Sequence, residues 1–337
     1  MNTKLYTGNG STNAISGIGF QPDLVWIKNR VTTGNQTWFN SISGATKYVS
    51  SNTTYSEATS APTLTSFDSD GFTLGSSADL NGSGNAICSW NWKAGTTGSG
   101  STTGAGTDKA YSYSVNVAGG FSITKYLGNG TSGHQIPHNL GVAPSMVIVK
   151  RLDNTRHWCV GHASEGWTKA GFLSATDSWD SAYDYWDNTD PTSSVVQLSN
   201  SVAVNSGDEN YIMYAFANKR GYLKCGGYLG NGSTNGQFVF TGHAPKFLMM
   251  KRVDGGGDKW RLWDNQRSTF NVVDDSLAPN ESSVEYDDVS VSLDFLSNGF
   301  KMRTSSGGAG NGSGERHIYL SIGQSLVGDN GIPNNAR

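Results

Sequence analysis

The apolar residues of this 337-residue chain occur in short runs rich in Val, Ile, Phe, Tyr and Trp, which Gly, Asn, Asp and Ser separate. Runs of this kind, bounded by turn-forming residues, are typical of β-strands, and no stretch keeps the 3.6-residue period of an amphipathic helix. Three runs, 22–28, 144–150 and 245–251, begin with Pro, end with Lys and are mostly apolar between. Each predicts a central strand buried on both faces. The pattern therefore predicts an all-β protein.

The chain repeats itself three times. A Tyr-x-Gly-Asn-Gly phrase begins at Tyr6, Tyr126 and Tyr228, and one of the Pro-to-Lys runs follows each copy. The spacing of about 100 residues is the size of a whole β-sandwich, whereas solenoid repeats have about 20–50 residues. We therefore predict three tandem antiparallel β-sandwich domains of one repeated topology. We also predict that the Gly-Asn-Gly phrases form hairpin turns, because Asn and Gly tolerate positive φ.

Composition sets the predicted domain boundaries. Residues 95–109 are mostly Gly, Ser and Thr, which have little to bury, and they are expected to form a flexible linker. The predicted organisation is a first sandwich (1–94), this linker (95–109), a second sandwich (110–217), a short junction (218–224), a third sandwich (225–323) and a polar C-terminal tail (324–337). The linker predicts that the first domain moves relative to the other two or is anchored to something other than them, whereas the short junction fixes the second domain against the third.

Charge and sorting signals exclude several classes of partner. The 24 Lys and Arg residues are scattered among 27 Asp and Glu residues, whereas a nucleic-acid-binding surface clusters its positive charge. The N-terminus lacks the apolar core of a signal peptide, and no apolar run reaches about 18 residues. We therefore expect synthesis in the cytoplasm, no membrane insertion and no nucleic-acid partner.

Metal, redox and catalytic motifs are weak in this sequence. Three cysteines, an odd number and far apart, predict reduced thiols, and Cys88 and Cys159 lie in strand-like runs that predict burial. Four of the six histidines fall in the second repeat, but their spacing places them in turns or on opposite faces of a strand (His134, His138, His157 and His162). No serine occupies a strand-to-helix elbow. We expect surface or turn histidines, no metal, no cofactor, no catalytic residue and no enzyme activity.

A lysine closes each Pro-to-Lys run, and a basic residue follows directly or one position later. The recurrence could create an anion-binding edge. We favour solvated strand ends, whose charge discourages edge-to-edge pairing of sheets (Lys28, Lys150 and Lys251).

The acidic and aromatic stretch 177–190 has the most unusual local composition. Aromatic faces beside carboxylates suit sugar stacking, and paired carboxylates could serve a glycosidase, while the alternative is a loop that packs on its own domain or a neighbour. We expect these aromatic rings to form an exposed apolar patch that lies in a contact, because Trp and Tyr often anchor interfaces. The candidate partner or glycan contacts are Trp179, Tyr183, Tyr185, Trp186, Asp180, Asp184 and Asp187.

The wording of the third repeat and of the junctions resembles a known repeat. The phrases concerned are 91–95 (NWKAG), 118–123 (AGGFSI), 224–232 (KCGGYLGNG), 238–242 (FVFTG), 294–301 (DFLSNGFK), 318–324 (IYLSIGQ) and 331–337 (GIPNNAR). They resemble the repeat of virion structural and tail-fibre-like proteins of marine tailed bacteriophages, including cyanophages. The resemblance covers nearly the whole chain, but the loop from Trp179 to Trp186 matches none of its phrases.

The resemblance implies a non-enzymatic virion component made in the host cytoplasm, either a head or tail decoration or a fibre-like part. It implies other virion proteins of the capsid or tail as partners. The aromatic loop 177–190 predicts a homo-oligomer, and the resemblance favours a trimer over a dimer. The first repeat begins within ten residues of Met1, which favours a compact attached subunit over a fibre shaft. The alternatives are a glycan-binding adhesin that contacts the host surface and, less favoured, a glycoside depolymerase.

Overall fold

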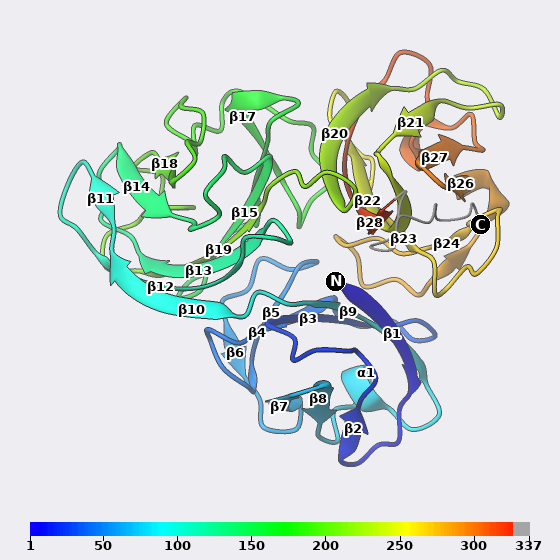
Figure 1. Cartoon of the computed structure of the whole chain (residues 1–337), viewed down its shortest axis with the longest axis horizontal. Coiled ribbons are helices and arrows are strands. Elements are labelled where there is room, and N and C mark those ends of the chain that lie inside the picture. The colour runs from blue at the N-terminus through cyan, green and yellow to red at the C-terminus, as the bar shows by residue number, and fades with distance from the viewer. Residues whose placement is uncertain (326–337) are drawn as a thin grey trace.

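Within residues 1–325, which the computed structural model describes, every strand pairing is antiparallel. The structure is nearly all β, as the sequence predicts. Three lobes surround a common centre (Figure 1), and we call them lobe 1 (1–94), lobe 2 (95–217) and lobe 3 (218–325). Most of the predicted tail lies outside the described residues.

The elements follow the repeats. Lobe 1 contains β1 (Asn2–Thr7), β2 (Asn13–Ile15), β3 (Leu24–Asn29), β4 (Thr37–Asn40), β5 (Lys47–Ser50), β6 (Ala58–Thr59), β7 (Leu64–Asp68), β8 (Gly71–Leu74), α1 (Ala78–Asn81) and β9 (Ala86–Trp92). Lobe 2 contains β10 (Thr96–Ser101), β11 (Thr103–Gly104), β12 (Ala110–Asn116), β13 (Phe121–Leu127), β14 (His134–Pro137), β15 (Met146–Arg151), β16 (Cys159–His162), β17 (Gly166–Phe172), β18 (Val195–Leu198) and β19 (Asn210–Phe216). Lobe 3 contains β20 (Leu223–Leu229), β21 (Phe238–Phe240), β22 (His243–Arg252), β23 (Arg261–Asp264), β24 (Asp275–Ser276), β25 (Tyr286–Asp287), η1 (Val289–Val291), β26 (Leu293–Leu296), β27 (Gly299–Met302), η2 (Gly307–Ala309) and β28 (Arg316–Ser325).

The three lobes share one topology. Each main sheet contains the strand order β1-β9-β3-β4, β13-β19-β15-β16 or β20-β28-β22-β23. The last strand of each lobe therefore lies between the strand that carries the tyrosine of the repeated phrase and the Pro-to-Lys strand. Tyr6, Tyr126 and Tyr228 lie on the equivalent strands β1, β13 and β20, each paired with the closing strand of its lobe. A small sheet packs on each main sheet, with the orders β2-β8-β7, β11-β14-β18 and β21-β27-β26.

The Pro-to-Lys strands are buried on both faces, as predicted. Alternate side chains of a strand point to opposite faces. On β3, Val25 and Ile27 enter the core between the two sheets of lobe 1, whereas Leu24 and Trp26 enter a core that all three lobes share. The same alternation divides Val147 and Val149 from Met146 and Ile148, and Leu248 and Met250 from Phe247 and Met249.

The Gly-Asn-Gly phrases do not form hairpins, contrary to the prediction. In lobe 1 the phrase joins β1 to β2, which belong to different sheets. A buried asparagine holds the loop: Asn81 accepts from the backbone N–H of Asn9 and donates to the carbonyls of Ser11 and Gly75. The first glycine, Gly8, allows close approach, because a Cβ there would lie 2.2 Å from a backbone oxygen. Asn205 and Asn311 repeat these contacts in lobes 2 and 3.

The predicted flexible linker is wrong. Residues 96–101 form β10, which pairs along its length with β12, and residues 103–104 form β11, which pairs with β14. The glycines make this possible, because Gly98 and Gly100 leave room for the rings of Tyr113 and Tyr111 on the neighbouring strand. Asp23 of lobe 1 also accepts hydrogen bonds from the Ala94 N–H and the Ser114 hydroxyl on either side of the boundary. Lobe 2 therefore begins before residue 110.

The first lobe is not free to move, because the shared core contains residues of all three lobes. Trp38 of lobe 1 packs edge-on against Trp158 of lobe 2, with 5.1 Å between ring centroids. Trp92 of lobe 1 packs against Phe247 of lobe 3 at 5.5 Å. Lobe 2 is joined to lobe 3 as well, since the backbone N–H of Trp179 donates to the Val253 carbonyl at 2.9 Å. The short junction predicts such a fixed relation between these two lobes.

Candidate functional site

The tryptophans of the aromatic loop (177–190) lie inside the molecule, so the expectation of an exposed aromatic patch is wrong. Trp179 is 7% exposed, belongs to the shared core, and covers Gly171, where a Cβ would lie 2.1 Å from the indole nitrogen. Trp186 is completely buried and meets Trp167 edge-on at 5.5 Å. Neither ring offers a face to a sugar or a partner.

The tyrosines of this loop are half-buried. Tyr183 and Tyr185 stack on each other at 5.8 Å and pack against the core of lobe 2. The Tyr185 carbonyl accepts from the N–H of Ser199, just after β18. The loop thus lies beside β18, at the place where β7 and β26 complete the small sheets of the other lobes.

The carboxylates of the loop have separate local roles. Asp180 accepts from the Ala182 N–H, and Asp187 accepts from the Ser132 hydroxyl and the Gln197 amide. Asp184 is exposed. Contact between these carboxylates and a partner or glycan stays a prediction.

Most of the predicted surface histidines are buried. His134 bonds to Asn205 and Thr102, at 2.8 and 2.7 Å, and His138 bonds to the Thr192 carbonyl. Burial lowers the pKa of His162 to about 4. His157 is exposed, as expected. Hydrogen bonds inside lobe 2, and from His162 to the Tyr319 carbonyl of lobe 3, therefore occupy these rings.

The three lysines that close the Pro-to-Lys strands are not solvated strand ends, as the sequence analysis expected. Lys28, Lys150 and Lys251 are at most 1% exposed. Each ammonium donates to at least one carbonyl of its own lobe and to one carbonyl of another lobe. The contacts across lobes are Lys28 to Ser282 (3.2 Å), Lys150 to Thr54 (3.1 Å) and Lys251 to Thr176 (3.2 Å). We call these three residues the lysine anchors.

The lysine anchors make equivalent contacts in a closed cycle. Lobe 1 reaches lobe 3, lobe 3 reaches lobe 2, and lobe 2 reaches lobe 1. A heterologous contact repeated three times closes a ring, as in a cyclic trimer, except that one chain supplies all three units. Burial lowers the pKa of each lysine to about 8. The sequence does contain a signal for this role. A lysine recurs at the same position of three strands that are predicted to be buried, which indicates a structural role.

A buried ionic network joins lobe 3 to lobe 1. Arg267 pairs with Asp264, at 2.5 Å, and with Glu285, at 2.8 Å, and Glu285 also binds Arg30 of lobe 1 through several hydrogen bonds. The Trp90 indole N–H of lobe 1 donates to Asp264 at 3.0 Å. Sequence reasoning missed this network, because Arg267 and Glu285 follow no repeated phrase.

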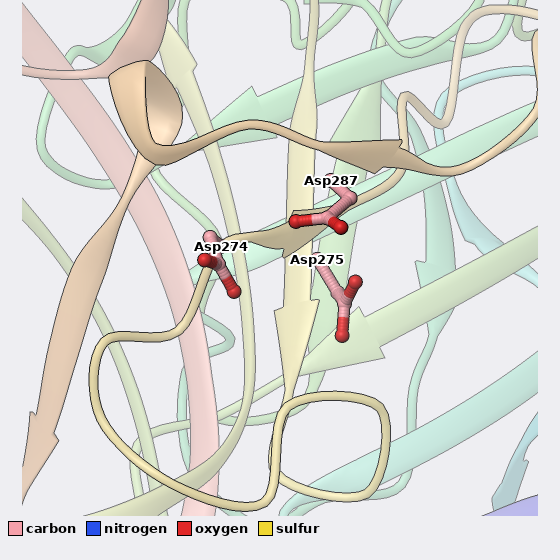
Figure 2. Close-up of side chains that lie close together, drawn as sticks. All are labelled: Asp274, Asp275 and Asp287. Atoms are coloured by element: carbon pink, nitrogen blue, oxygen red, sulfur yellow. The ribbon is translucent and has the colours of Figure 1, made fainter.

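Three carboxylates near this network lie close together at β24 and β25 (Figure 2). Asp275 and Asp287 are direct partners across the two strands, and the side-chain oxygens of Asp274, Asp275 and Asp287 lie within 4.8 Å of one another. Burial, followed by the charge of Glu285, raises the pKa of Asp275. Oxygen ligands of this type suit Ca²⁺ or Mg²⁺, so these residues are the cluster in the described chain that could hold a hard cation.

All three cysteines are buried free thiols. Burial raises the pKa of Cys159 to about 12, and it also raises those of Cys88 and Cys225. The prediction of small buried hydrophobic positions at Cys88 and Cys159 is confirmed. Thiols with raised pKa values are poor nucleophiles.

The fold and these contacts define a class: an all-β chain whose three like lobes close into a ring on a shared core. The chain belongs to the family described as a domain of unknown function, DUF7483, whose model matches residues 1–325. The family unit thus spans all three lobes. No curated protein and no solved structure matches the chain. In residues 1–325, no helix is long and apolar enough to cross a membrane.

Proposed function

We propose that this chain is a non-enzymatic structural protein of a tailed-bacteriophage virion, exposed on the particle as a head or tail decoration or as a fibre-like part. The sequence phrases that resemble virion repeats support the proposal. The single structural observation that carries it is the ring in which each lysine anchor binds the next lobe. Such a ring is a rigid block of three like lobes.

A rigid block suits a particle that must persist outside the cell. The lobes are held by a shared core, and the free thiols are buried where oxidants have little access. Stability therefore needs no disulfide, which suits a protein made in the reducing cytoplasm of a host and then exposed on a particle.

The partners proposed are other virion proteins of the capsid or tail, and after them a glycan of the host surface. Assembly into a homotrimer rests on the sequence resemblance alone, because the buried Trp179 and Trp186 give it no support. One chain already supplies three equivalent lobes, so a monomer could occupy a threefold position on a particle.

The test is to find the protein in purified particles. Particles of the phage that encodes the chain are purified through a density gradient, analysed by mass spectrometry, and imaged by electron cryomicroscopy. We expect the chain at a fixed copy number, with density of three lobes on the outer surface. Its absence from particles that contain the other virion proteins would refute the proposal. A glycan array and an assay for reducing sugars from host polysaccharide separate the adhesin and the depolymerase from a decoration.

A further inference from the structure

Two strand edges that are covered in lobe 2 are bare in lobe 3. In lobe 2, β12 pairs with the outer edge of β13, and β11 pairs with the outer edge of β14. The segment that supplies both covering strands is 96–116. In lobe 3 the equivalent strands are β20 and β21, and each ends its sheet within the described residues. Lobe 3 has no counterpart of the covering segment in this part of the chain.

A groove lies between these bare edges. Its volume is about 550 Å³, β20 and β21 line it, and Ala163 and Ser164 of lobe 2 complete its wall. Figure 1 shows β20 on the side of lobe 3 that faces lobe 2. We call this groove the edge groove. It corresponds to the place that residues 96–116 fill in lobe 2.

The backbone of β20 presents hydrogen-bonding groups to the edge groove. The Cys225 N–H points away from β28, because it donates to the Asn218 side chain at 2.7 Å. In an antiparallel strand every second residue points to the same edge, so the N–H and C=O groups of Gly227 and Leu229 point outward too. In lobe 2 the positions equivalent to Cys225 and Gly227 are Ile123 and Lys125, which face Ser114 and Ser112 of β12.

Two exposed phenylalanines line the edge groove beside its polar residues. Phe238 is 40% exposed and Phe240 is 60% exposed, whereas Leu229, which is 57% exposed, lies outside the groove lining at the end of β20. In lobe 2 the covering strand β12 packs two aromatic residues, Tyr111 and Tyr113, against the core of the lobe. An aromatic side chain from an added strand would meet Phe238 and Phe240 in the same way and would remove their surface from water.

We propose that the edge groove binds an extended segment of another protein, which adds to β20 as an antiparallel strand. Main-chain hydrogen bonds at Gly227 and Leu229 supply affinity, and pockets beside the phenylalanines supply selectivity, as in other cases of strand addition. The occupant is uncharged over its paired residues and alternates small and aromatic residues, because β12, with the sequence AYSYSVN, is the segment that fills the equivalent place. The inference is independent of the virion assignment.

The test uses the full chain and a fluorescent peptide of residues 109–117 (KAYSYSVNV). We expect saturable binding, slower amide exchange at Gly227 and Leu229, and at least tenfold weaker binding to Phe240→Ser. A peptide with both tyrosines changed to serine should bind at least tenfold more weakly. The control is Phe270→Ser, which changes a residue that is 79% exposed and does not line the groove.

Three outcomes would overturn the proposal. These are no binding at millimolar peptide, equal binding to Phe240→Ser and to the control, and protection that appears on another strand. Dimerisation that protects the same two amides would replace the foreign segment with a second copy of this chain.

Discussion

At the scale of single residues, the lysine anchors show how a charged group can be part of a core. Lys150 is completely buried, yet its ammonium has two carbonyl partners, Thr54 of lobe 1 and Arg156 of its own lobe. A buried donor or acceptor that loses its partner costs about 1–3 kcal/mol. The anchors therefore penalise separation of the lobes, because separation leaves an ammonium and a carbonyl without partners.

Truncation of an anchor should destabilise the whole molecule. Lys150→Ala removes a buried aliphatic stem and the donor to two carbonyls, and should lower the free energy of unfolding by about 2–5 kcal/mol. Lys150→Met keeps the aliphatic stem and should lower the free energy of unfolding by less than Lys150→Ala does. Lys93→Ala is the control, because Lys93 is exposed and such changes cost within about 0.5 kcal/mol. Urea unfolding measures all three. Equal effects at the two positions would show that Lys150 is no anchor.

The aromatic loop gives a second prediction. Trp186→Ala should lower the free energy of unfolding by about 3–5 kcal/mol, because the ring is completely buried against Trp167. Asp184→Ala, on the same loop but exposed, should have little effect. Thermal unfolding followed by near-ultraviolet circular dichroism checks both. A Trp186→Ala variant that melts with the parent would restore the interpretation of the loop as an exposed contact.

The anchors also predict an unusual dependence of stability on pH. Their pKa values are lowered to about 8, against about 10.4 in an unfolded chain, so the unfolded state binds more protons between these values. Each anchor should therefore raise the free energy of unfolding between about pH 8 and pH 10, by at most about 1.4 kcal/mol per pH unit. The three buried thiols oppose this rise above about pH 8.5, because burial raises their pKa values and the unfolded thiols lose their protons first. Above pH 10 the free energy of unfolding should fall, because burial raises the pKa of Tyr126 and other tyrosines.

Urea unfolding at pH 7, 8, 9 and 10 measures this slope, and Lys150→Met should reduce it. An equal slope between pH 8 and pH 10 in Lys150→Met and in the parent protein would mean that burial does not disfavour the charged lysine. Below pH 6.5 stability should decline as well, since burial lowers the pKa values of His162 and His243 to about 4 and the unfolded histidines take up protons first.

At the scale of elements, the sequence predicts the strands better than it predicts their partners. The apolar runs and the period of two locate β3, β15 and β22 and their burial. The same pattern does not reveal that one face of each strand meets other lobes, because side-chain alternation specifies faces and not neighbours. The Gly-Asn-Gly loops show a similar limit, since Asn81 lies far along the chain from the loop that it holds.

The largest difference between the prediction from composition and the structure is at β10. Gly, Ser and Thr predict a linker because they bury little themselves, but position 98 must be Gly because the ring of Tyr113 on the next strand leaves no room for a Cβ. Gly98→Val should therefore destabilise the edge of lobe 2, since a Cβ would lie 2.6 Å from the tyrosine hydroxyl oxygen. Thr97→Val is the matched control at an exposed neighbour.

Amide exchange along 96–116 measures the effect of these two variants. We expect faster exchange throughout β10 in Gly98→Val and unchanged exchange in Thr97→Val. Fast exchange of β10 in the parent protein itself would support the flexible linker instead.

At the scale of the whole molecule, the repeats predict three similar units, and the structure adds that these units form one body. Size favours independent folding, because about 100 residues can form a sandwich alone. The positions of the tryptophans argue against independent folding of a lobe. Those of lobe 1 that point into the shared core are Trp26, Trp38, Trp90 and Trp92. A lobe on its own would expose these rings to water. The sequence holds this information only as an excess of tryptophan, which does not say where the rings lie.

The central claim is that the three lobes fold as one cooperative unit, and scanning calorimetry tests it most directly. We expect a single transition whose calorimetric enthalpy equals the van't Hoff enthalpy. We also expect Trp260→Ala, which removes a lobe 3 ring from the shared core, to shift the whole transition to lower temperature. Two or three separate transitions, with only one of them shifted by Trp260→Ala, would contradict the account and restore three independent domains.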